Sequence, residues 1–279
     1  MSLHFCSLAS GSSGNSQYVG SDTTKLLVDA GLSGKYIRTA LESIEVDPST
    51  IEGILVTHEH SDHIKGVGVL MRKFDLRLYV NEGTWLAMKA KIGKIDEEKV
   101  TIFENDVPFV IGDIEVKPYG ISHDAADPVG YSFQSKGAKV CIATDLGEAC
   151  ERIVGEMQDC DLLMIEANHD VEMLKMGKYP YFLKQRILGE HGHLCNDYTG
   201  ELVTEAIRGG RVNNVLLGHL SRENNFPELA YETVRQIVEK NDIEVGIDVN
   251  IDMAYRDRTS RYYRITSRPM GEIGVCEED

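Results

Sequence analysis

The stretch T-H-E-H-S-D-H, residues 57–63, constrains the structure of this chain more than any other feature of its sequence. An apolar run typical of a buried strand, G-I-L-V, leads into three histidines and one aspartate: His58, His60, Asp62 and His63. On a tight turn between a strand and a helix, His58 and His60 can point the same way and bind one metal ion. Asp62 and His63, further along, can reach a second ion. Imidazole and carboxylate groups bind Zn²⁺, Fe²⁺ and Mn²⁺, so the motif favours a metal site over a solvated histidine-rich loop.

Four side chains cannot complete two metal sites, so we expect further ligands where other buried strands end. Apolar runs predict strands at residues 25–31, 53–58, 76–80, 139–145, 161–167 and 214–219. Helices are expected at residues 66–74, 84–90, 183–189, 197–208 and 226–240. His123, Asp145 and His219 each lie at or just past the end of an apolar run, where a rigid sheet would position them. We therefore predict all three as metal ligands, although any one of them alone would more commonly lack a metal.

A short internal echo predicts two similar half-units, about residues 1–135 and 136–279, within one domain that spans residues 1–279. One strand-like run ends in Asp29 followed by Ala-Gly, and another ends in Asp145 followed by Leu-Gly. The chain has no low-complexity segment and no linker rich in proline or glycine, which favours one unit over two tethered domains. Strands that alternate with helices predict an α/β protein with layered sheets and helices outside them.

Composition sets broad limits on partners and compartment. The formal net charge of −16 opposes non-specific attraction to nucleic acid or to anionic membranes, but a local field or bound divalent ions can still attract a phosphodiester. No apolar run approaches the ~20 residues that a membrane helix needs. The N-terminal residues lack the basic and apolar regions of a secretory signal. Six scattered cysteines without a C-x-x-C pair are typical of reduced thiols, so we predict a cytoplasmic protein without a membrane partner.

The motif H-E-H-S-D-H resembles the H-x-H-x-D-H signature of the metallo-β-lactamase superfamily, and Asp29, His123, Asp145 and His219 follow in the order of its other metal motifs. Five further stretches are similar to the bacterial WalJ (YycJ) subgroup: S-L-A-S-G-S-S-G-N, V-D-A-G-L-S-G-K, S-H-D-A, E-A-N-H-D-V-E-M-L and H-L-S-R-E-N-N. The similarity covers most of the chain and is weakest after about residue 248. It implies a four-layer αββα sandwich of two mixed sheets flanked by helices, with the site at the joined edge of the sheets.

The resemblance also implies two ligand sets that share Asp145. One ion would bind His58, His60, His123 and Asp145, and the other Asp62, His63, His219 and Asp145. Asp29 would orient the first turn without binding metal. The ions would be Zn, Mn or Fe, and a water shared between them would supply the attacking hydroxide near neutral pH. Asp62 would also be catalytic, orienting or deprotonating that nucleophile.

Departures from related groups narrow the chemistry. His60 stands where the flavo-diiron oxidoreductases have glutamate, which disfavours redox iron chemistry. The bridging position is Asp145, whereas secreted zinc β-lactamases have cysteine there, so antibiotic hydrolysis is not the expected role. The interval between Asp145 and His219 leaves no room for the cap domain of the β-CASP nucleases. The chain also lacks a Gly/Pro-rich insertion like the flexible arm of the ribonuclease Z family.

His193 is the predicted proton donor. The stretch E-H-G-H-L-C-N-D-Y resembles the non-ligand histidine motif of superfamily phosphodiesterases, and histidine suits a leaving alkoxide that needs a proton near neutral pH. The alternative is a helix-capping turn, with Asn196 or Asp197 as N-cap and His193 exposed. His191 is a weaker candidate for the same role. His169 would line the cleft or be an ordinary surface or hydrogen-bonded histidine.

These observations predict a dinuclear metal-dependent hydrolase that cleaves phosphodiesters, with nucleic acid or a small phosphodiester as its substrate. The subgroup resemblance implies an exonuclease-like DNA or RNA nuclease. One alternative is a thioester or lactone hydrolase, since a carbonyl substrate has less need for His193. Another is a regulatory metal-binding protein without turnover. A homo-oligomer is compatible with the sequence.

Three further features have less specific interpretations. Residues 8–15, L-A-S-G-S-S-G-N, lack the spacing of a phosphate-binding P-loop and predict a tight turn between strands, near the cleft. Residues 255–268 interleave arginines with tyrosines, which suits a nucleic-acid backbone, although a polar strand or surface extension is the commoner outcome. Cys195 lies beside His193 in sequence but is expected to be a buried, inert thiol.

Overall fold

Two seven-stranded sheets form the centre of the computed structural model, which describes residues 2–266. The first sheet has the order β14-β1-β2-β3-β4-β5-β6. Its strands are Tyr263–Ile265, Leu3–Ala9, Ser16–Gly20, Lys25–Val28, Gly53–Leu55, Arg77–Asn81 and Val100–Phe103. The second has the order β13-β12-β11-β10-β9-β8-β7. Its strands are Asn250–Met253, Asn214–Gly218, Leu162–Glu166, Ala138–Ala143, Val129–Ser135, Ile114–Gly120 and Phe109–Ile111.

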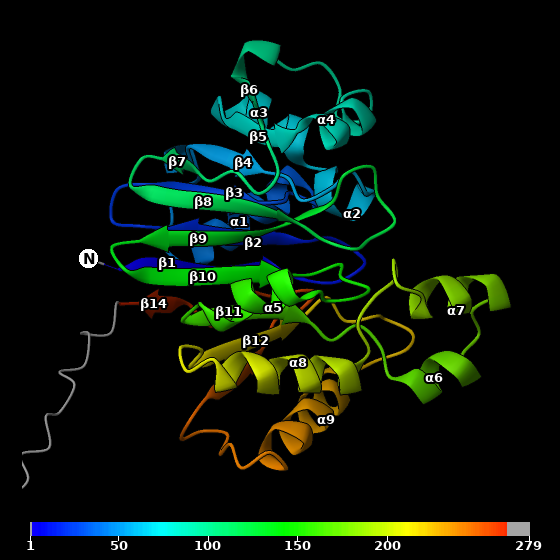
Figure 1. Cartoon of the computed structure of the whole chain (residues 1–279). Coiled ribbons are helices and arrows are strands. Elements are labelled where there is room, and N and C mark those ends of the chain that lie inside the picture. Colours follow the sequence, from blue (N-terminus) through cyan, green and yellow to red (C-terminus); the bar gives the residue numbers. More distant parts are fainter. Residues whose placement is uncertain (1, 267–279) are drawn as a thin grey trace, which may run out of the picture.

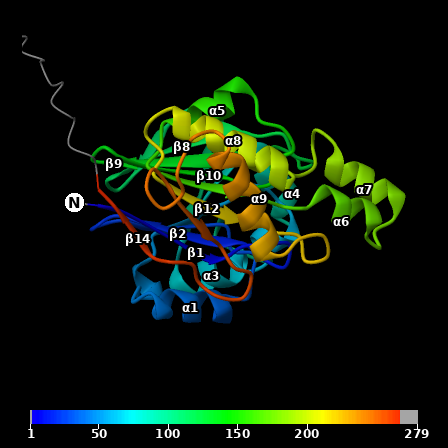
Figure 2. The same ribbon diagram turned by 90° about the horizontal axis from the view of Figure 1, so that it is seen from below.

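Helices cover the outer faces of both sheets. They are α1 (Gly34–Ser43), α2 (Ser61–Ile64), α3 (Val67–Phe74), α4 (Glu82–Met88), α5 (Glu151–Gln158), α6 (Val171–Met176), α7 (Tyr181–Leu188), α8 (Asn196–Arg208) and α9 (Pro227–Glu239). Short 3-10 turns occupy Pro48–Thr50 and Glu97–Lys99. Helices α1 and α3 lie on one side of the sandwich and α5, α8 and α9 on the other, while α6 and α7 extend from one side (Figures 1 and 2). The predicted αββα sandwich is confirmed.

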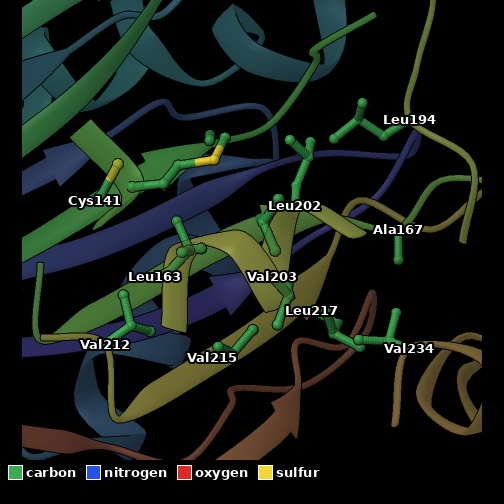
Figure 3. Packing of buried hydrophobic residues seen from close by; sticks show 14 of the residues in the cluster. Cys141, Leu163, Ala167, Leu194, Leu202, Val203, Val212, Val215, Leu217 and Val234 are labelled. Carbon is green, nitrogen blue, oxygen red and sulfur yellow. The ribbon is translucent and has the colours of Figure 1, made fainter. Parts of the chain in front are cut away.

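The strands are apolar on both faces because each face packs against a different layer. In β10, Val140 and Ile142 join the cluster between the two sheets, whereas Cys141 and Ala143 pack under the helices of the second sheet. The helix-side cluster continues into α8 and α9 through Leu202, Val203 and Val234 (Figure 3). A third cluster joins the first sheet to α1 and α3. Strands buried on both faces read as continuous apolar runs, which is why the sequence predicts them without strict alternation.

Parallel pairing brings the functional turns together. Strands β3, β4, β5 and β6 pair in parallel, as do β10, β11, β12 and β13, so their carboxyl ends share an edge in each sheet. Three residues at or just past these ends, Asp29, Asp145 and His219, have positive φ values of 59°, 57° and 53°. Non-glycine residues in this left-handed region are uncommon and cluster at functional sites, where packing holds the strain. The carboxyl ends of these strands form what we call the carboxyl-end platform, and the sequence predicts the metal ligands there.

Each predicted strand and helix falls on an observed element, with ends that differ by a few residues. The strand predicted at residues 25–31 stops at Val28 because the positive φ of Asp29 turns the chain out of the sheet. The prediction omits α1, α2, α5 and α6. It also omits the strands β1, β2, β6, β7, β8, β9, β13 and β14, most of which pair antiparallel or lie at the edges of the sheets. Helices long and apolar enough to cross a bilayer are absent from residues 2–266.

The expected division near residue 135 does not coincide with the two sheets. The chain passes from the first sheet to the second between β6 and β7, and returns to the first with β14. Residue 135 instead ends β9, which pairs antiparallel with β10 through a tight turn at Lys136 and Gly137, both with positive φ. Within the arginine-rich segment 255–268 the structure places an edge strand, β14, but this strand is not the polar one that was expected, because Tyr263 and Ile265 are buried between the sheets. Arg268 and Cys276 lie outside the described residues.

Candidate metal centre

The turn after β4 is held by Asp29. The backbone N–H and the hydroxyl of Thr57 donate to the two carboxylate oxygens of Asp29, at 2.9 and 2.8 Å. His63 Nδ1 lies 2.7 Å from Asp29 Oδ2, and because a carboxylate only accepts, Nδ1 carries the hydrogen. This leaves the lone pair of His63 on Nε2, which lies 3.3 Å from Asp145 Oδ2. Asp29 thus orients a predicted ligand, as the sequence led us to expect.

His58, His60 and His123 form the first group of candidate ligands. One nitrogen from each lies within 4.8 Å of the others, and His58 Nε2 is 3.1 Å from His60 Nδ1. His123 Nδ1 donates to the carbonyl oxygen of Gly192 at 3.2 Å, so its Nε2 is free to bind a cation. That Nε2 lies 3.7 Å from Asp145 Oδ1. These contacts place four predicted ligands of one ion side by side.

Asp62, His63 and His219 form the second group, again with ligand atoms within 4.8 Å of one another. His219 Nδ1 donates to Glu166 Oε2 at 3.1 Å. Its Nε2 is buried without a hydrogen-bond partner among the described residues, 3.4 Å from Asp145 Oδ1 and 4.0 Å from Asp62 Oδ2. An unpartnered buried nitrogen costs free energy, which a bound cation would remove.

Asp145 lies between the two groups. Its carboxylate is within 4 Å of ring nitrogens from both groups, on His63, His123 and His219, and its buried Oδ2 has no hydrogen-bond partner among residues 2–266. The structure therefore brings all seven predicted metal ligands into one cluster, from four strand ends and α2. Their individual coordination roles, including the bridging role of Asp145, stay predictions.

The electrostatics of the cluster fit a divalent cation. Burial would lower the pKa of His63, but Asp145, Asp29 and Asp62 raise that pKa to about 9. The pKa of His219 is also raised, because Asp145, Asp62 and Glu166 outweigh the effect of burial. The protein thus holds protons on buried imidazoles where negative charge is concentrated, and a divalent ion would replace them. A buried set of imidazole and carboxylate groups, in which Asp145 Oδ2 and His219 Nε2 have no hydrogen-bond partner among the described residues, suits a divalent metal ion.

Glu166 contacts the cluster of candidate ligands, although the sequence analysis did not assign it to the site. It is fully buried at the end of β11, and its Oε1 accepts from the backbone N–H groups of Leu146 and Leu194 at 2.7 and 3.1 Å. Its Oε2 accepts from Nδ1 of both His193 and His219, each at 3.1 Å. Burial would raise the pKa of Glu166, but these two histidines hold it well below its usual range. The signal was available, because Glu166 is a polar residue at a strand end like the other candidates.

Asp124 is the second unassigned residue. Its Oδ1 lies 3.4 Å from His123 Nε2 and 4.0 Å from His60 Nε2, and it has no hydrogen-bond partner in the described part of the chain. Its Oδ2 pairs with Arg186 of α7. Asp124 thus links the first ligand group to the helices that extend from the sandwich. The sequence gave no reason to assign Asp124 a role apart from its position directly after His123.

A pocket of about 250 Å³ opens onto the cluster. One wall consists of His60, Asp62, His123, Asp145, His193 and His219. A more apolar part of the lining comes from α7 and the residues before it: Tyr179, Leu183, Arg186 and Ile187. The site can therefore hold a substrate with a charged group near the candidate ligands and an apolar part against α7.

The remaining sequence candidates have clear positions. Helix α8 begins at Asn196, and its N-cap is Cys195 without a side-chain cap, so the capping interpretation of this stretch is wrong. His191 is exposed and contacts Ser122 at 2.8 Å. His169 is buried outside the pocket lining, and burial lowers its pKa to about 4, so it is neutral near pH 7. Cys195 is half-buried, and burial raises the pKa of its thiol.

Comparisons with known proteins agree with this geometry. The sequence profile described as "Beta-lactamase superfamily domain" matches residues 24–220. The chain is 47% identical over 246 residues to "Exodeoxyribonuclease YycJ" of Bacillus anthracis, which covers 88% of this chain and 93% of that protein. It is 46% identical over 246 residues to "Exodeoxyribonuclease WalJ" of Streptococcus pneumoniae serotype 2, covering 88% and 91%.

Solved structures of low sequence identity share the fold. The metallo-β-lactamase fold protein YhfI of Bacillus subtilis superposes with a TM-score of 0.71 at 15% identity, covering 95% of this chain and all of that one. A diphosphatase of the PhnP family superposes with a TM-score of 0.65 at 15% identity, covering 95% and 98%. At this identity the likeness concerns the arrangement of the sheets and helices alone.

Proposed function

Since the chain belongs to the metallo-β-lactamase superfamily and is a metal-dependent hydrolase, we propose that it removes nucleotides from DNA by hydrolysing phosphodiester bonds. The relatives at 46–47% identity are named exodeoxyribonucleases and match along nearly their full length. The observation that carries the proposal is the contact of His193 with Glu166 beside the candidate metal ligands. Through that contact Glu166 orients His193, which can then donate a proton to the leaving oxygen.

His193 is oriented for proton transfer by Glu166. Its Nδ1 donates to the buried carboxylate, so the proton available to a substrate sits on Nε2. The side chain lines the pocket and is 21% exposed, while Glu166 is fully buried and ionised. The hydrogen bond to this buried carboxylate fixes the orientation of a ring that lines the pocket. His193 is thus our proposed general acid, positioned by Glu166.

We infer that two divalent ions would be held, one by His58, His60 and His123 and the other by Asp62, His63 and His219; Asp145 lies within 4 Å of members of both groups. When bound, such ions supply Lewis acidity, a water of lowered pKa and charge stabilisation for the phosphate oxygens. Zn²⁺, Mn²⁺ and Fe²⁺ all suit imidazole and carboxylate donors. Asp62 lies at the rim of the second group and is about one quarter exposed, which suits the orientation of an attacking water.

The wall formed by α7 and Tyr179 suits a nucleoside. Tyr179, Leu183 and Ile187 present apolar surface in the same pocket as the acidic and histidine-rich wall. A base or sugar can pack there while its phosphate faces the candidate metal ligands. Arg186, tied to Asp124, adds a cation at the same wall. This arrangement favours a nucleotide over a small thioester or lactone.

The test is hydrolysis by the full-length protein with Mn²⁺ or Zn²⁺ added. We expect turnover of end-labelled single-stranded DNA to mononucleotides and of bis-p-nitrophenyl phosphate. A parallel assay with a thioester substrate should show much less turnover. Thioester hydrolysis that exceeds phosphodiester hydrolysis under the same conditions would refute the assignment and favour the carbonyl alternative. A parallel RNA substrate measures the preference for DNA.

His193→Ala tests the acid, and His191→Ala is its matched control on the same loop. We expect His193→Ala to lower kcat for DNA by about 10²- to 10⁴-fold while bound metal, measured by atomic emission, is unchanged. The effect on bis-p-nitrophenyl phosphate should be much smaller, because nitrophenolate leaves without a proton. Equal losses on both substrates would assign His193 a role other than proton donation.

We also infer a cytoplasmic location from the cysteines. The five cysteines between residues 2 and 266 are all free thiols. Four of them are partly or fully buried, which suits a compartment that keeps thiols reduced. Fractionation of cells that express a tagged protein would test this location, with a periplasmic or secreted distribution contradicting it.

A further inference from the structure

A second pocket adjoins the one at the metal centre. It measures about 260 Å³, and Ser221 lines both pockets. The pocket is formed by Ser10, by residues 220–222 and 225–227, and by residues 254–257. These segments include the H-L-S-R-E-N-N stretch and the start of the arginine-rich segment, which the proposed chemistry at the metals does not use. The pocket therefore requires a separate explanation.

Two arginines give this pocket its character. Arg256 is half-buried, and its Nη2 donates to the carbonyl oxygen of Leu220 at 2.7 Å. Its guanidinium lies against the turn of residues 8–15, where a Cβ at Gly11 would be 3.3 Å from Arg256 Nε. Leu220 directly follows His219, a candidate metal ligand. The hydrogen bond thus ties Arg256 to the residue that follows a candidate metal ligand.

Arg222 lines the same pocket and is exposed. Burial, followed by the positive charge of Arg222, lowers the pKa of Arg256, whereas Asp257, Tyr179 and Glu223 act in the opposite direction. Asp257 also lines the pocket, but among the described residues neither guanidinium forms an ion pair within 4 Å. The chain has 45 acidic and 29 basic residues, so most arginines have carboxylates available as partners. Two arginines in one pocket without an ion pair are therefore unusual in this chain. Because both positive charges line one pocket and act on each other, an anion that enters this pocket is attracted by both.

We propose that this pocket binds a phosphate of the DNA strand other than the one being hydrolysed, through Arg222 and Arg256. The inference rests on the proposed function and adds a second anchoring point for the same substrate. Guanidinium groups bind phosphate oxygens through paired N–H donors, which suits this anion better than a single ammonium would. Phe226, which is exposed and also lines the pocket, offers a ring face for the adjoining base, whereas Arg258 covers one face of the Tyr255 ring.

The first test measures binding of a strand that resists hydrolysis. The probe is fluorescein-labelled pentathymidylate with phosphorothioate linkages, and its affinity for the metal-loaded full-length protein is measured by anisotropy at several salt concentrations. The variant is Arg222→Gln with Arg256→Gln. The control, Lys25→Gln with Arg77→Gln, removes the same charge at the amino ends of β3 and β5, away from the carboxyl-end platform.

We expect the arginine variant to bind about tenfold more weakly. The slope of log affinity against log salt should fall in magnitude by about 0.7, because the variant neutralises one phosphate fewer. The control should stay within about twofold of wild type, with an unchanged slope. Equal affinities and slopes for the variant and the control would overturn the proposal. If Arg256→Gln disturbs folding, Arg222→Gln alone, which changes an exposed side chain, can be compared with the control in the same way. Circular dichroism checks the fold of each variant.

The second test locates the phosphate by neutralising one linkage at a time with methylphosphonate. At one position near the cleaved bond, the neutral linkage should lower kcat/KM of the wild-type enzyme about tenfold and leave the arginine variant unaffected. The same sensitivity in both proteins would overturn the pocket assignment while leaving the nuclease in place. Arginine-dependent binding without hydrolysis of any DNA would instead support the pocket and refute the proposed nuclease function.

Discussion

Replacing Glu166 with glutamine tests whether one buried carboxylate orients both a metal ligand and the proton donor. Two backbone N–H groups donate to Oε1, at 2.7 and 3.1 Å, so the amide oxygen of glutamine should stay on that side. The amide NH₂ then faces Nδ1 of His193 and His219. Because NH₂ donates and does not accept, both rings must lose the Nδ1 hydrogen or face a repulsive contact.

The magnitude follows from the hydrogen bonds that the substitution removes. If the Nδ1 hydrogen of His219 moves to Nε2, that nitrogen can no longer bind a cation. If the hydrogen stays, a hydrogen bond to a charged acceptor is broken, which is worth about 1.5–3 kcal/mol. Either way we expect metal affinity at the second ligand group to fall by about 10- to 100-fold, the range typical of residues that orient metal-binding histidines. Turnover of DNA should fall further, because His193 loses its anionic partner.

The assay is competition between the protein and a fluorescent zinc chelator, followed by turnover of DNA at saturating metal. Glu156→Gln is the matched control, because Glu156 is also a buried glutamate but pairs with Lys117 and Lys139 away from the metal centre. The control should keep metal affinity within about twofold of wild type. Wild-type metal affinity and wild-type turnover in Glu166→Gln would refute the reasoning.

Three further predictions concern metal, backbone and pH. Chelation with EDTA should abolish turnover and lower Tm by at least about 5 °C, and adding Zn²⁺ or Mn²⁺ should restore both. Differential scanning calorimetry measures Tm, and an unchanged Tm would contradict metal binding by the buried ligand cluster. A Cβ at Gly31 would lie 1.6 Å from the carbonyl oxygen of Asp62, so Gly31→Ala should displace the turn and abolish metal binding, which atomic emission measures. The control is Gly155→Ala, where a Cβ meets nothing within 4 Å, and this variant should bind metal like wild type. Burial raises the pKa of Glu156 but Lys117 and Lys139 lower it more, so its folded pKa is below the unfolded value of about 4.3. The stability it contributes is therefore present above that pH and lost as pH falls through the folded pKa. The gap of about 2–4 kcal/mol between wild type and Glu156→Gln in urea unfolding should narrow below pH 5, and a constant gap would contradict the linkage.

Much of the fold and of the metal cluster could be predicted from local sequence. The central strands are apolar on both faces, so K-V-C-I-A and D-L-L-M-I are recognisable as buried strands without tertiary information. The residues where such runs end are Asp29, His58, Asp145 and His219, and parallel pairing brings strand ends to one edge. The dense histidine motif and the rule that polar residues emerge at strand ends therefore sufficed to name the seven candidate ligands.

Which parts of the chain belong to which sheet could not be predicted from local sequence. The antiparallel hairpin of β9 and β10 lies wholly in the second sheet, although the local pattern suggested a boundary there. Strand β14 returns to the first sheet beside β1, a pairing between the two ends of the chain. Such long-range pairings depend on which edges remain uncovered after the central strands have packed, and a local pattern carries no information about that.

The sequence by itself determined which side chains can bind metal, because ligand chemistry and strand ends are local properties. Only the tertiary structure decided how those side chains are supported. Glu166 contacts His193 and His219 at once, and Arg256 lies beside Arg222 against the turn of residues 8–15. Each of these contacts joins segments far apart in the chain. Their partners are selected by the distance and direction between packed strand ends, which exist only after both sheets have come together.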